Sequence, residues 1–218
     1  MKVIITGATG LVGEGVMLVC LDNPAVTEVL SISRKPLANK HSKLKELLLK
    51  DFSGISNHRG QVEGYDGCFF CAGVSSLGEN EESFTKKTFD FVVPFAGVLS
   101  GINPGMTFTY VSGIGTDSSE KGKIMWARVK GRTENALMRL PFKAVYNFRP
   151  GFMKPVKGQK TVRFIYRVFE VLFPVWLAVA PRWACTMGEV GLAMINCVSK
   201  GYRQSIIDVK DIRTLAAS

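Results

Sequence analysis

Apolar runs alternate with polar turns along the whole chain, and their lengths and periods predict alternating strands and helices. Short apolar or β-branched runs predict strands at residues 2–6, 28–33, 47–49, 67–71, 106–112 and 142–148. Longer runs with helical spacing predict helices at residues 11–21, 83–100, 123–139 and 187–200. Pro94 is expected to kink the second of these helices, and Thr186 to cap the last. This alternation predicts a doubly wound parallel α/β sheet with helices on both faces.

The chain reads as one domain. No linker, internal repeat or low-complexity stretch interrupts its 218 residues, a length that suits a single domain. We expect a core over about residues 1–150 and a small, mostly helical extension over about residues 151–218. The whole chain has 46% hydrophobic and 21% charged residues, which is typical of a globular protein and argues against disorder. The opening MKVIITGATG is interpreted as a strand and a turn rather than a signal peptide, and no spanning helix is predicted.

The stretch TGATGLVGEG at residues 6–15 joins the first strand to the first helix. One glycine allows the tight turn, a second lets the backbone approach a pyrophosphate, and a third lets the helix pack against the strand. The helix N-terminus then offers N–H groups to phosphate oxygens. This context, inside a strand–helix–strand unit, predicts a dinucleotide site in a Rossmann-type fold. The residues expected to form it are Gly7, Thr9, Gly10, Leu11, Val12 and Gly13.

The end of the second strand indicates which dinucleotide is bound. NAD-binding folds usually carry an acidic residue there, which hydrogen-bonds the ribose 2′-hydroxyl. This chain has Ser33, Arg34 and Lys35 instead, and two cations with a hydroxyl attract a 2′-phosphate. We therefore expect NADP(H) to be preferred over NAD(H).

Several short motifs together resemble the short-chain dehydrogenase/reductase superfamily. They are the N-terminal TGATGLVG, Asp51-Phe52, Cys71-Ala72-Gly73, Val111-Ser112 and Arg149-Pro150-Gly151. The similarity is to the extended and atypical members described as NAD-dependent epimerase/dehydratase-like, and within them to the small Tat-interacting-protein-like oxidoreductases. It covers about residues 1–155 and implies an oxidoreductase with a small-molecule substrate, which no motif identifies.

The resemblance implies a role for each matching position. Asp51 and Phe52 would border the adenine, and Ser112 would be the hydroxyl that orients the substrate. Lys130 would hold the nicotinamide ribose. The remaining positions would line the adenosine ribose and pyrophosphate or flank the nicotinamide, and they are Cys71, Ala72, Gly73, Val74, Pro150, Gly151 and Phe152.

The helix at residues 123–139 departs from the family at its catalytic position. The family has Tyr four residues before its Lys, whereas this chain has Trp126 before Lys130, and no YxxxK occurs anywhere. An indole N–H cannot exchange a proton near neutral pH as a phenol with a lowered pKa can. Met125, Val129, Ala136 and Leu140 are expected to form the core face, which leaves Trp126 and Lys130 on a line facing a cofactor cleft.

Three alternatives follow for the chemistry. The chain is a reductase whose proton comes from water, from Ser112 through Lys130 or from the substrate. Alternatively, it is a weakly catalytic cofactor-sensing, regulatory or scaffold protein. The third alternative is another of the family's reactions, although these also generally use the Tyr.

Positive charge is concentrated in the second half of the chain. Residues 110–218 hold 18 Lys and Arg against 7 Asp and Glu, within a net charge of +10. General solubility together with attraction for a phosphorylated cofactor is the favoured interpretation of this charge, and no nucleic acid is expected because the cations are scattered without a reading motif. Residues 152–183 combine the cations Lys157, Lys160, Arg163 and Arg167 with the apolar LFPVWLAVAP. A lid over the cofactor cleft is favoured there over a membrane-surface segment.

The cysteines indicate a reducing compartment. Five of them are scattered along the chain, so a cytoplasmic location without disulfides is expected. Cys68 and Cys71 lie three apart in a predicted strand, point to opposite faces and are interpreted as small core residues. No Cys/His cluster has zinc-like spacing, so no metal is expected. Nothing in the sequence indicates the oligomeric state.

Overall fold

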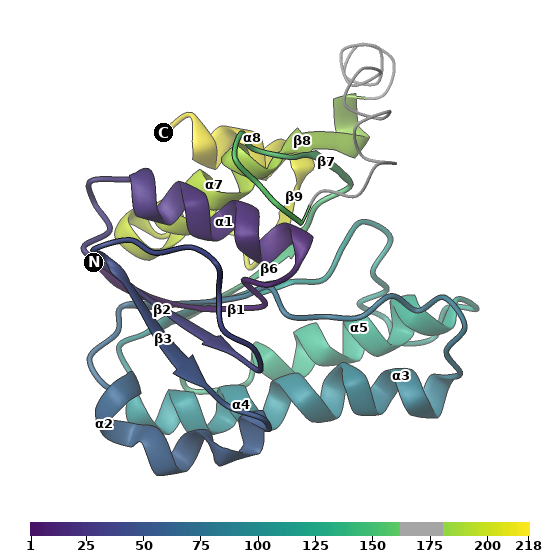
Figure 1. The fold of residues 1–218 in the computed structure, drawn as a ribbon. Coiled ribbons are helices and arrows are strands. Elements are labelled where there is room, and N and C mark those ends of the chain that lie inside the picture. The colour runs from purple at the N-terminus through teal and green to yellow at the C-terminus, as the bar shows by residue number, and fades with distance from the viewer. Residues whose placement is uncertain (162–180) are drawn as a thin grey trace.

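The fold is built on one parallel sheet, seen in the computed structural model, which describes residues 1–161 and 181–218 (Figure 1). Seven strands pair in the order β3-β2-β1-β4-β5-β6-β9, every pair parallel. They are β1 (Lys2–Thr6), β2 (Glu28–Ser33), β3 (Leu44–Leu48), β4 (Gly67–Phe70), β5 (Thr107–Val111), β6 (Ala144–Arg149) and β9 (Ile206–Asp208). The first six follow the doubly wound dinucleotide-binding order, which reverses between β1 and β4. The predicted fold class is therefore confirmed.

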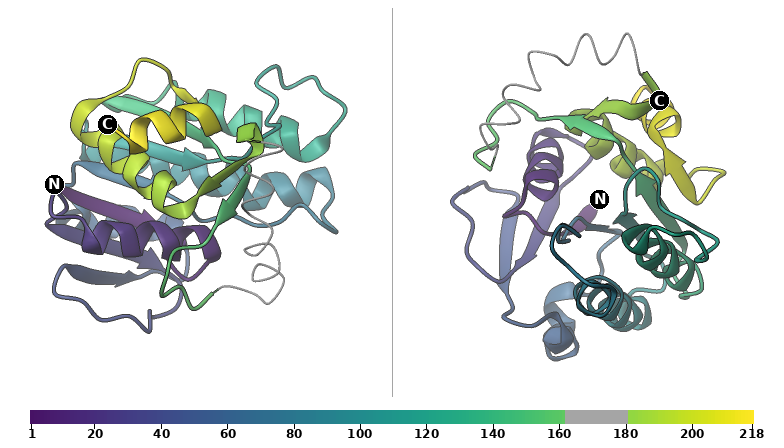
Figure 2. Two further views of the ribbon diagram at one scale, coloured as in Figure 1. Left: turned by 90° about the horizontal axis from the view of Figure 1, so that it is seen from above. Right: turned by 90° about the vertical axis from the view of Figure 1, so that its right-hand side faces the viewer.

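Helices cover both faces of the sheet (Figures 1 and 2). On one face lie α1 (Leu11–Asp22), α7 (Met187–Lys200) and α8 (Val209–Ala216). The elements on the other side are the 3₁₀ helix η1 (Phe52–His58), α2 (Arg59–Val62), α3 (Glu81–Lys87), α4 (Phe89–Ile102) and α5 (Met125–Leu137). A small second sheet pairs β7 (Phe152–Lys154) with β8 (Ala184–Thr186), which follows the short helix η2 (Pro181–Trp183).

The sequence KVIIT of strand β1 suits a central position in the sheet. Val3 and Ile5 face the α1 side, and Ile4 faces the α4 side; all three are fully buried. Because both faces of a central parallel strand are covered, a continuous β-branched run fits it better than an alternating one. Burying each of these side chains contributes about 1.5–3 kcal/mol.

The prediction of a single helix over residues 83–100 is wrong in one respect. The structure has two helices there, and the break lies at Thr88, with φ −121° and ψ −76°, rather than at Pro94. Helix α4 runs through Pro94 because its apolar side chains pack onto the sheet and hold it in place, among them Val92 and Phe95. Tertiary packing overrides the tendency of one proline to interrupt a helix.

The C-terminal extension agrees with the sequence in part. Helix α7 has the predicted bounds, and Thr186 caps it in a reciprocal capping box with Glu189. The sequence did not reveal the edge strand β9 or the short helix α8, which complete the sheet and one helical layer. The predicted lid residues Arg163 and Arg167 lie outside the described residues, as does the LFPVWLAVAP segment up to residue 180. Within the described ranges, no helix is both long and apolar enough to cross a membrane.

Candidate functional site: a dinucleotide cleft at the carboxyl edge of the sheet

The turn after β1 leaves no room for side chains at two of its glycines. Gly7 has φ +74°, and a Cβ there would lie 2.6 Å from the backbone nitrogen of Ala72 at the end of β4. A Cβ at Gly13 would lie 2.2 Å from the carbonyl oxygen of Gly7. The first turn of α1 therefore packs directly against the loop, as a pyrophosphate-binding turn requires.

Helix α1 begins without a side-chain cap. Its N-cap residue is Gly10, whose N–H closes the turn by donating to the Gly7 carbonyl at 2.8 Å. The N–H groups of the first turn thus have no capping side chain, which suits phosphate oxygens. Thr9 is exposed and Leu11 and Val12 are half-buried around this turn, so the predicted phosphate-binding residues lie together.

A small cavity lies at the carboxyl ends of β4 and β5. The Ala72 N–H donates to the Thr6 hydroxyl at 3.3 Å, which ties the end of β4 to the end of β1. Four residues expected to hold the cofactor line this cavity: Ala72, Gly73, Val74 and Lys130. The sequence did not indicate the remaining lining residues, which are Lys87, Thr88, Val92, Tyr110 and Val111. Cys71, just before Ala72, is partly buried.

The end of β2 presents two cations to solvent. Arg34 and Lys35 are exposed, and no hydrogen bond or ion pair among residues 1–161 and 181–218 uses either side chain. The Ser33 hydroxyl is buried and donates to the Lys35 carbonyl at 2.6 Å, so it stabilises the turn. Arg34 and Lys35 remain the groups at this corner that could meet a phosphate.

Asp51 and Phe52 lie at the start of η1. The Asp51 carboxylate caps that helix by accepting from the Ser53 N–H and hydroxyl, and these bonds lower its pKa. Phe52 is 4% exposed, and its ring packs with Phe91 and Phe95 in the core. Its side chain therefore supports the wall of the cleft from behind, and Asp51 is the one of the pair that solvent reaches.

Lys130 lies one helical turn before a buried carboxylate on α5. Its ammonium donates to the Ser112 carbonyl at the end of β5. Burial lowers the pKa of Lys130 to about 8, although the nearby Glu134 carboxylate acts in the opposite direction. A lysine with this pKa exchanges its proton close to neutral pH.

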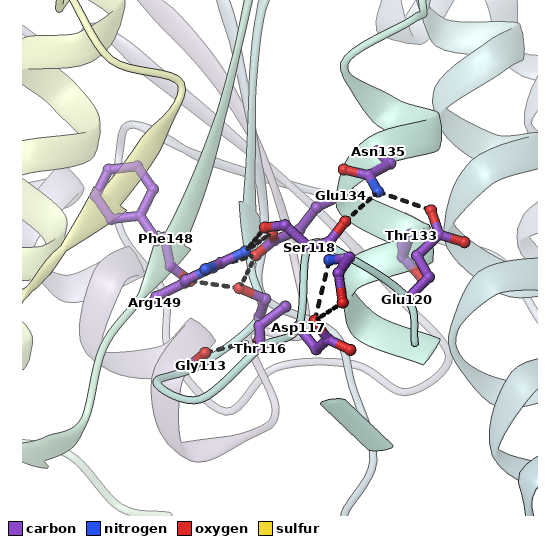
Figure 3. Close-up of polar contacts among 12 residues, drawn as sticks. Gly113, Thr116, Asp117, Ser118, Glu120, Thr133, Glu134, Asn135, Phe148 and Arg149 are labelled. Atoms are coloured by element: carbon purple, nitrogen blue, oxygen red, sulfur yellow. Dashed lines mark hydrogen bonds and ion pairs between the residues drawn. The ribbon is translucent and has the colours of Figure 1, made fainter. Parts of the chain in front are cut away.

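Glu134 and Arg149 form a buried charged pair (Figure 3), and the Ser112 hydroxyl joins it. Glu134 is fully buried and accepts two hydrogen bonds from Arg149, from Nε at 3.0 Å and from Nη2 at 2.5 Å. The Ser112 hydroxyl, itself 4% exposed, donates to the same carboxylate at 2.5 Å and lies 3.1 Å from the Phe148 carbonyl. Arg149 also donates to the Ser118 hydroxyl in the loop after β5. The Ser112 hydroxyl is thus held inside the fold.

Sequence reasoning missed Glu134, although a signal was present. Trp126, Lys130 and Glu134 lie at intervals of four, on one line along α5. The predicted core face was wrong in part: Val129 is buried, but Met125, Ala136 and Leu140 are only partly so. Ala127 and Leu137 are buried with Glu134 instead.

Trp126 lies at the edge of the site. Its side chain is half-buried, and its ring packs over Gly115, where a Cβ would lie 3.3 Å from Cη2. Gly115 belongs to the loop after β5, so the indole borders the same sheet edge as Lys130 without lining the small cavity.

The Arg-Pro-Gly segment turns the chain away from β6. The buried Pro150 accepts from the Ile114 N–H at 2.9 Å, and a Cβ at Gly151 would lie 2.1 Å from the Trp183 carbonyl oxygen. Phe152 follows as the half-buried first residue of β7. These contacts join the loop after β5 to the C-terminal extension at the expected nicotinamide end.

Cysteine geometry agrees with a packing role. Cys68 is fully buried in β4, Cys71 is partly buried, and both have free thiols. Burial raises the pKa of Cys71 to about 12, so its thiol is protonated and unreactive near neutral pH. Among the residues with described positions, no group of three or more acidic, Cys or His side chains could hold a metal ion.

Comparison with curated proteins finds two relatives of modest similarity. The chain is 29% identical over 143 residues to "Leucinostatins biosynthesis cluster protein T" from Purpureocillium lilacinum, covering 64% of this chain and 52% of that protein. It is 28% identical over 156 residues to "Protein FMP52, mitochondrial" from Candida albicans, covering 69% and 66%. The chain thus spans about half to two-thirds of these relatives. No protein-family model matches it.

Solved structures identify the fold. A short-chain dehydrogenase family protein from Francisella tularensis superposes with a TM-score of 0.67 at 14% identity, over 94% of each chain. The Bordetella bronchiseptica enzyme WbmG, solved in complex with NAD, has a TM-score of 0.67 at 11% identity, over 100% of this chain and 77% of that one. The chain therefore has the fold of the short-chain dehydrogenase/reductase and epimerase superfamily, as the glycine turn and the Arg-Pro-Gly segment indicated.

Proposed function

We propose that this protein is an NADP(H)-binding oxidoreductase of the short-chain dehydrogenase type. One observation carries the proposal. The consecutive residues Ala72, Gly73 and Val74 and the distant Lys130 line one cavity beside a glycine turn that a Cβ would block. A backbone-lined turn at an uncapped helix start fits a pyrophosphate, and an ammonium at the far side fits a ribose hydroxyl.

The exposed cations at the end of β2 support NADP(H) as the cofactor. Arg34 and Lys35 are unpaired within the described part of the chain, and the family's acidic residue is absent from that strand end. A 2′-phosphate would therefore gain charge-assisted hydrogen bonds that a 2′-hydroxyl would not.

A fluorescence titration tests this assignment. We expect NADPH to bind at least about tenfold more tightly than NADH, because one charge-assisted contact contributes about 1.5–3 kcal/mol. Arg34→Ala should remove most of that preference, whereas Lys40→Ala, which removes an exposed cation from the same loop, should leave it intact. Equal affinity for the two cofactors in the wild type would overturn the NADP(H) assignment.

The chemistry must work without the family's tyrosine. When bound, the reduced cofactor supplies a hydride, and the substrate oxygen then needs a proton. Trp126 cannot supply it, whereas the Lys130 ammonium, with a pKa of about 8, is able to do so. The Ser112 hydroxyl already donates within the Glu134 network, so its role is proposed to be positioning rather than direct contact with substrate.

Trp126→Tyr measures what the missing phenol costs. A general acid typically contributes about 10²–10⁴-fold, so restoring it should raise carbonyl reduction by NADPH about 100-fold or more. Trp126→Phe is the matched control, because it changes the ring without adding a hydroxyl. Equal rates for Tyr and Phe variants would favour the alternative of a cofactor-bound regulatory protein.

The biological setting stays a prediction. The curated relative from a biosynthesis cluster supports a small-molecule substrate, and the free thiols are compatible with the proposed cytoplasmic location. Imaging of the tagged full-length protein in its own cells would test that location, because the other relative is described as mitochondrial.

A further inference from the structure

A larger cavity lies beyond the nicotinamide end of the cleft. It has a volume of about 590 Å³, within the usual range for small-molecule sites. It is walled by the loop after β5, by the end of β9, by α8 and by η2. The lining residues are Ile114, Arg182, Asp208, Val209, Lys210, Arg213 and Thr214. None of them belongs to the expected dinucleotide site.

Three contacts place this cavity next to the expected nicotinamide wall. Ile114 in its lining donates its N–H to the Pro150 carbonyl. Asp208 lies beside Arg149 in the register of β9 with β6. Trp183, which follows Arg182, lies directly over Gly151. A substrate held here would thus border the Pro150–Gly151 segment.

The lining is positively charged. Arg182, Lys210 and Arg213 face one carboxylate, Asp208, which is also close enough to Arg149 for their charges to interact. Arg213 donates to the Ala184 carbonyl at 2.5 Å and so holds β8 against α8. No hydrogen bond or ion pair found in the described ranges occupies the side chain of Arg182 or Lys210. Ile114 and Val209 supply an apolar wall.

We propose that this cavity binds the anionic oxygens, from a carboxylate or a phosphate, of the protein's small-molecule substrate. The substrate assignment rests on the proposed reductase function, since that function places the reacting carbonyl at the neighbouring nicotinamide end. Two cations that have no partner among residues 1–161 and 181–218 supply the attraction, and Arg213 adds a third positive charge from a fixed position. The apolar wall accommodates the body of the molecule.

An NMR titration of the full-length ¹⁵N-labelled protein tests the site directly. The probes are succinate, inorganic phosphate and the uncharged succinamide, all at constant ionic strength. We expect at least one of the two anions to shift the amide signals of Ile114, Lys210 and Thr214 saturably, while succinamide leaves them in place. The anion that binds more tightly identifies the carboxylate or the phosphate as the better ligand.

A pair of double variants separates the site from general surface charge. Arg182→Gln with Lys210→Gln should weaken anion binding about tenfold or more, since hydrogen bonds to charged groups contribute about 1.5–3 kcal/mol each. Arg139→Gln with Lys143→Gln removes the same charge from exposed positions between α5 and β6. These positions lie before the amino end of β6, whereas the cavity lies at the carboxyl end of β9. This control should change binding less than about twofold.

Two results would overturn the proposal: no saturable shift with either anion, or equal weakening by the two double variants. The titration needs no cofactor, and NADPH binding is measured separately on the same samples. Loss of anion binding and failure of the cofactor assignment are therefore distinct results.

Discussion

The two ends of the proposed cofactor cleft are built from different chemical groups. At the phosphate end, Gly7 and Gly13 bring backbone against backbone, and no side chain caps the helix that begins there. At the catalytic end, a fully buried carboxylate from Glu134 joins Arg149 and the Ser112 hydroxyl. One end depends on the absence of side chains, and the other on the presence of particular ones.

This difference explains what the two ends tolerate. A backbone site accepts most changes in its surroundings but cannot accept an added Cβ. A buried charge network fails when either partner is removed, because the remaining charge is left without compensation. The proposed cofactor binding at one end can therefore persist while residues at the other end change, as the Trp126 position illustrates.

Breaking the charged end should have the largest effect on stability. Glu134→Gln leaves the Arg149 guanidinium mostly buried without its counter-charge, so the free energy of unfolding should fall by about 3–5 kcal/mol. Urea denaturation measures this loss. Glu82→Gln is the control, because the Glu82–Lys86 pair is exposed on α3 and should contribute less than about 0.5 kcal/mol. Similar losses in both variants would contradict the proposed importance of burial.

Adding a single methyl group should break the backbone end. In Gly13→Ala the new Cβ meets the Gly7 carbonyl, so the turn must shift, and unfolding should become easier by about 1–3 kcal/mol with loss of NADPH affinity. Gly101→Ala, in α4 with no atom near its Cβ position, should instead stabilise the fold by about 0.5–1 kcal/mol. Thermal unfolding and NADPH titration measure both. A Gly13→Ala protein that binds NADPH normally would disprove the close approach.

Titration of Lys130 should make the free energy of unfolding depend on pH, and this effect should be smaller than the two above. Its pKa is about 8 in the folded chain against an ordinary value of 10.5, so the unfolded chain binds the proton more readily between these pH values. Below pH 8 the folded state bears the cost of a desolvated ammonium, and this cost is relieved as pH rises toward 10.5.

Lys130→Met separates the contribution of Lys130 to this pH dependence from that of other groups that titrate in the same range. The stability of wild type relative to Lys130→Met should rise above pH 8, by at most about 1.4 kcal/mol per pH unit. Parallel urea unfolding of both proteins across this range measures the difference. A difference that does not vary with pH would show that Lys130 is well solvated.

The features that the sequence predicted correctly are those that depend on residues close together in the chain. The strand KVIIT, the glycine turn and the α7 capping box depend on residues within a few positions of one another, so their patterns are legible in the chain. The break at Thr88 and the edge strand β9 depend on packing between distant segments, and the sequence pattern misplaced the first and missed the second.

The sequence by itself determined the class of fold and the glycine turn after the first strand, because glycine spacing and β-branched runs act through local backbone geometry. Only the tertiary structure decided that Glu134 meets Arg149 and Ser112, and that Arg182 and Lys210 share a cavity. Those residues come from different elements of the chain. Their contacts are fixed by the folding that brings them together, so local pattern could not have revealed them.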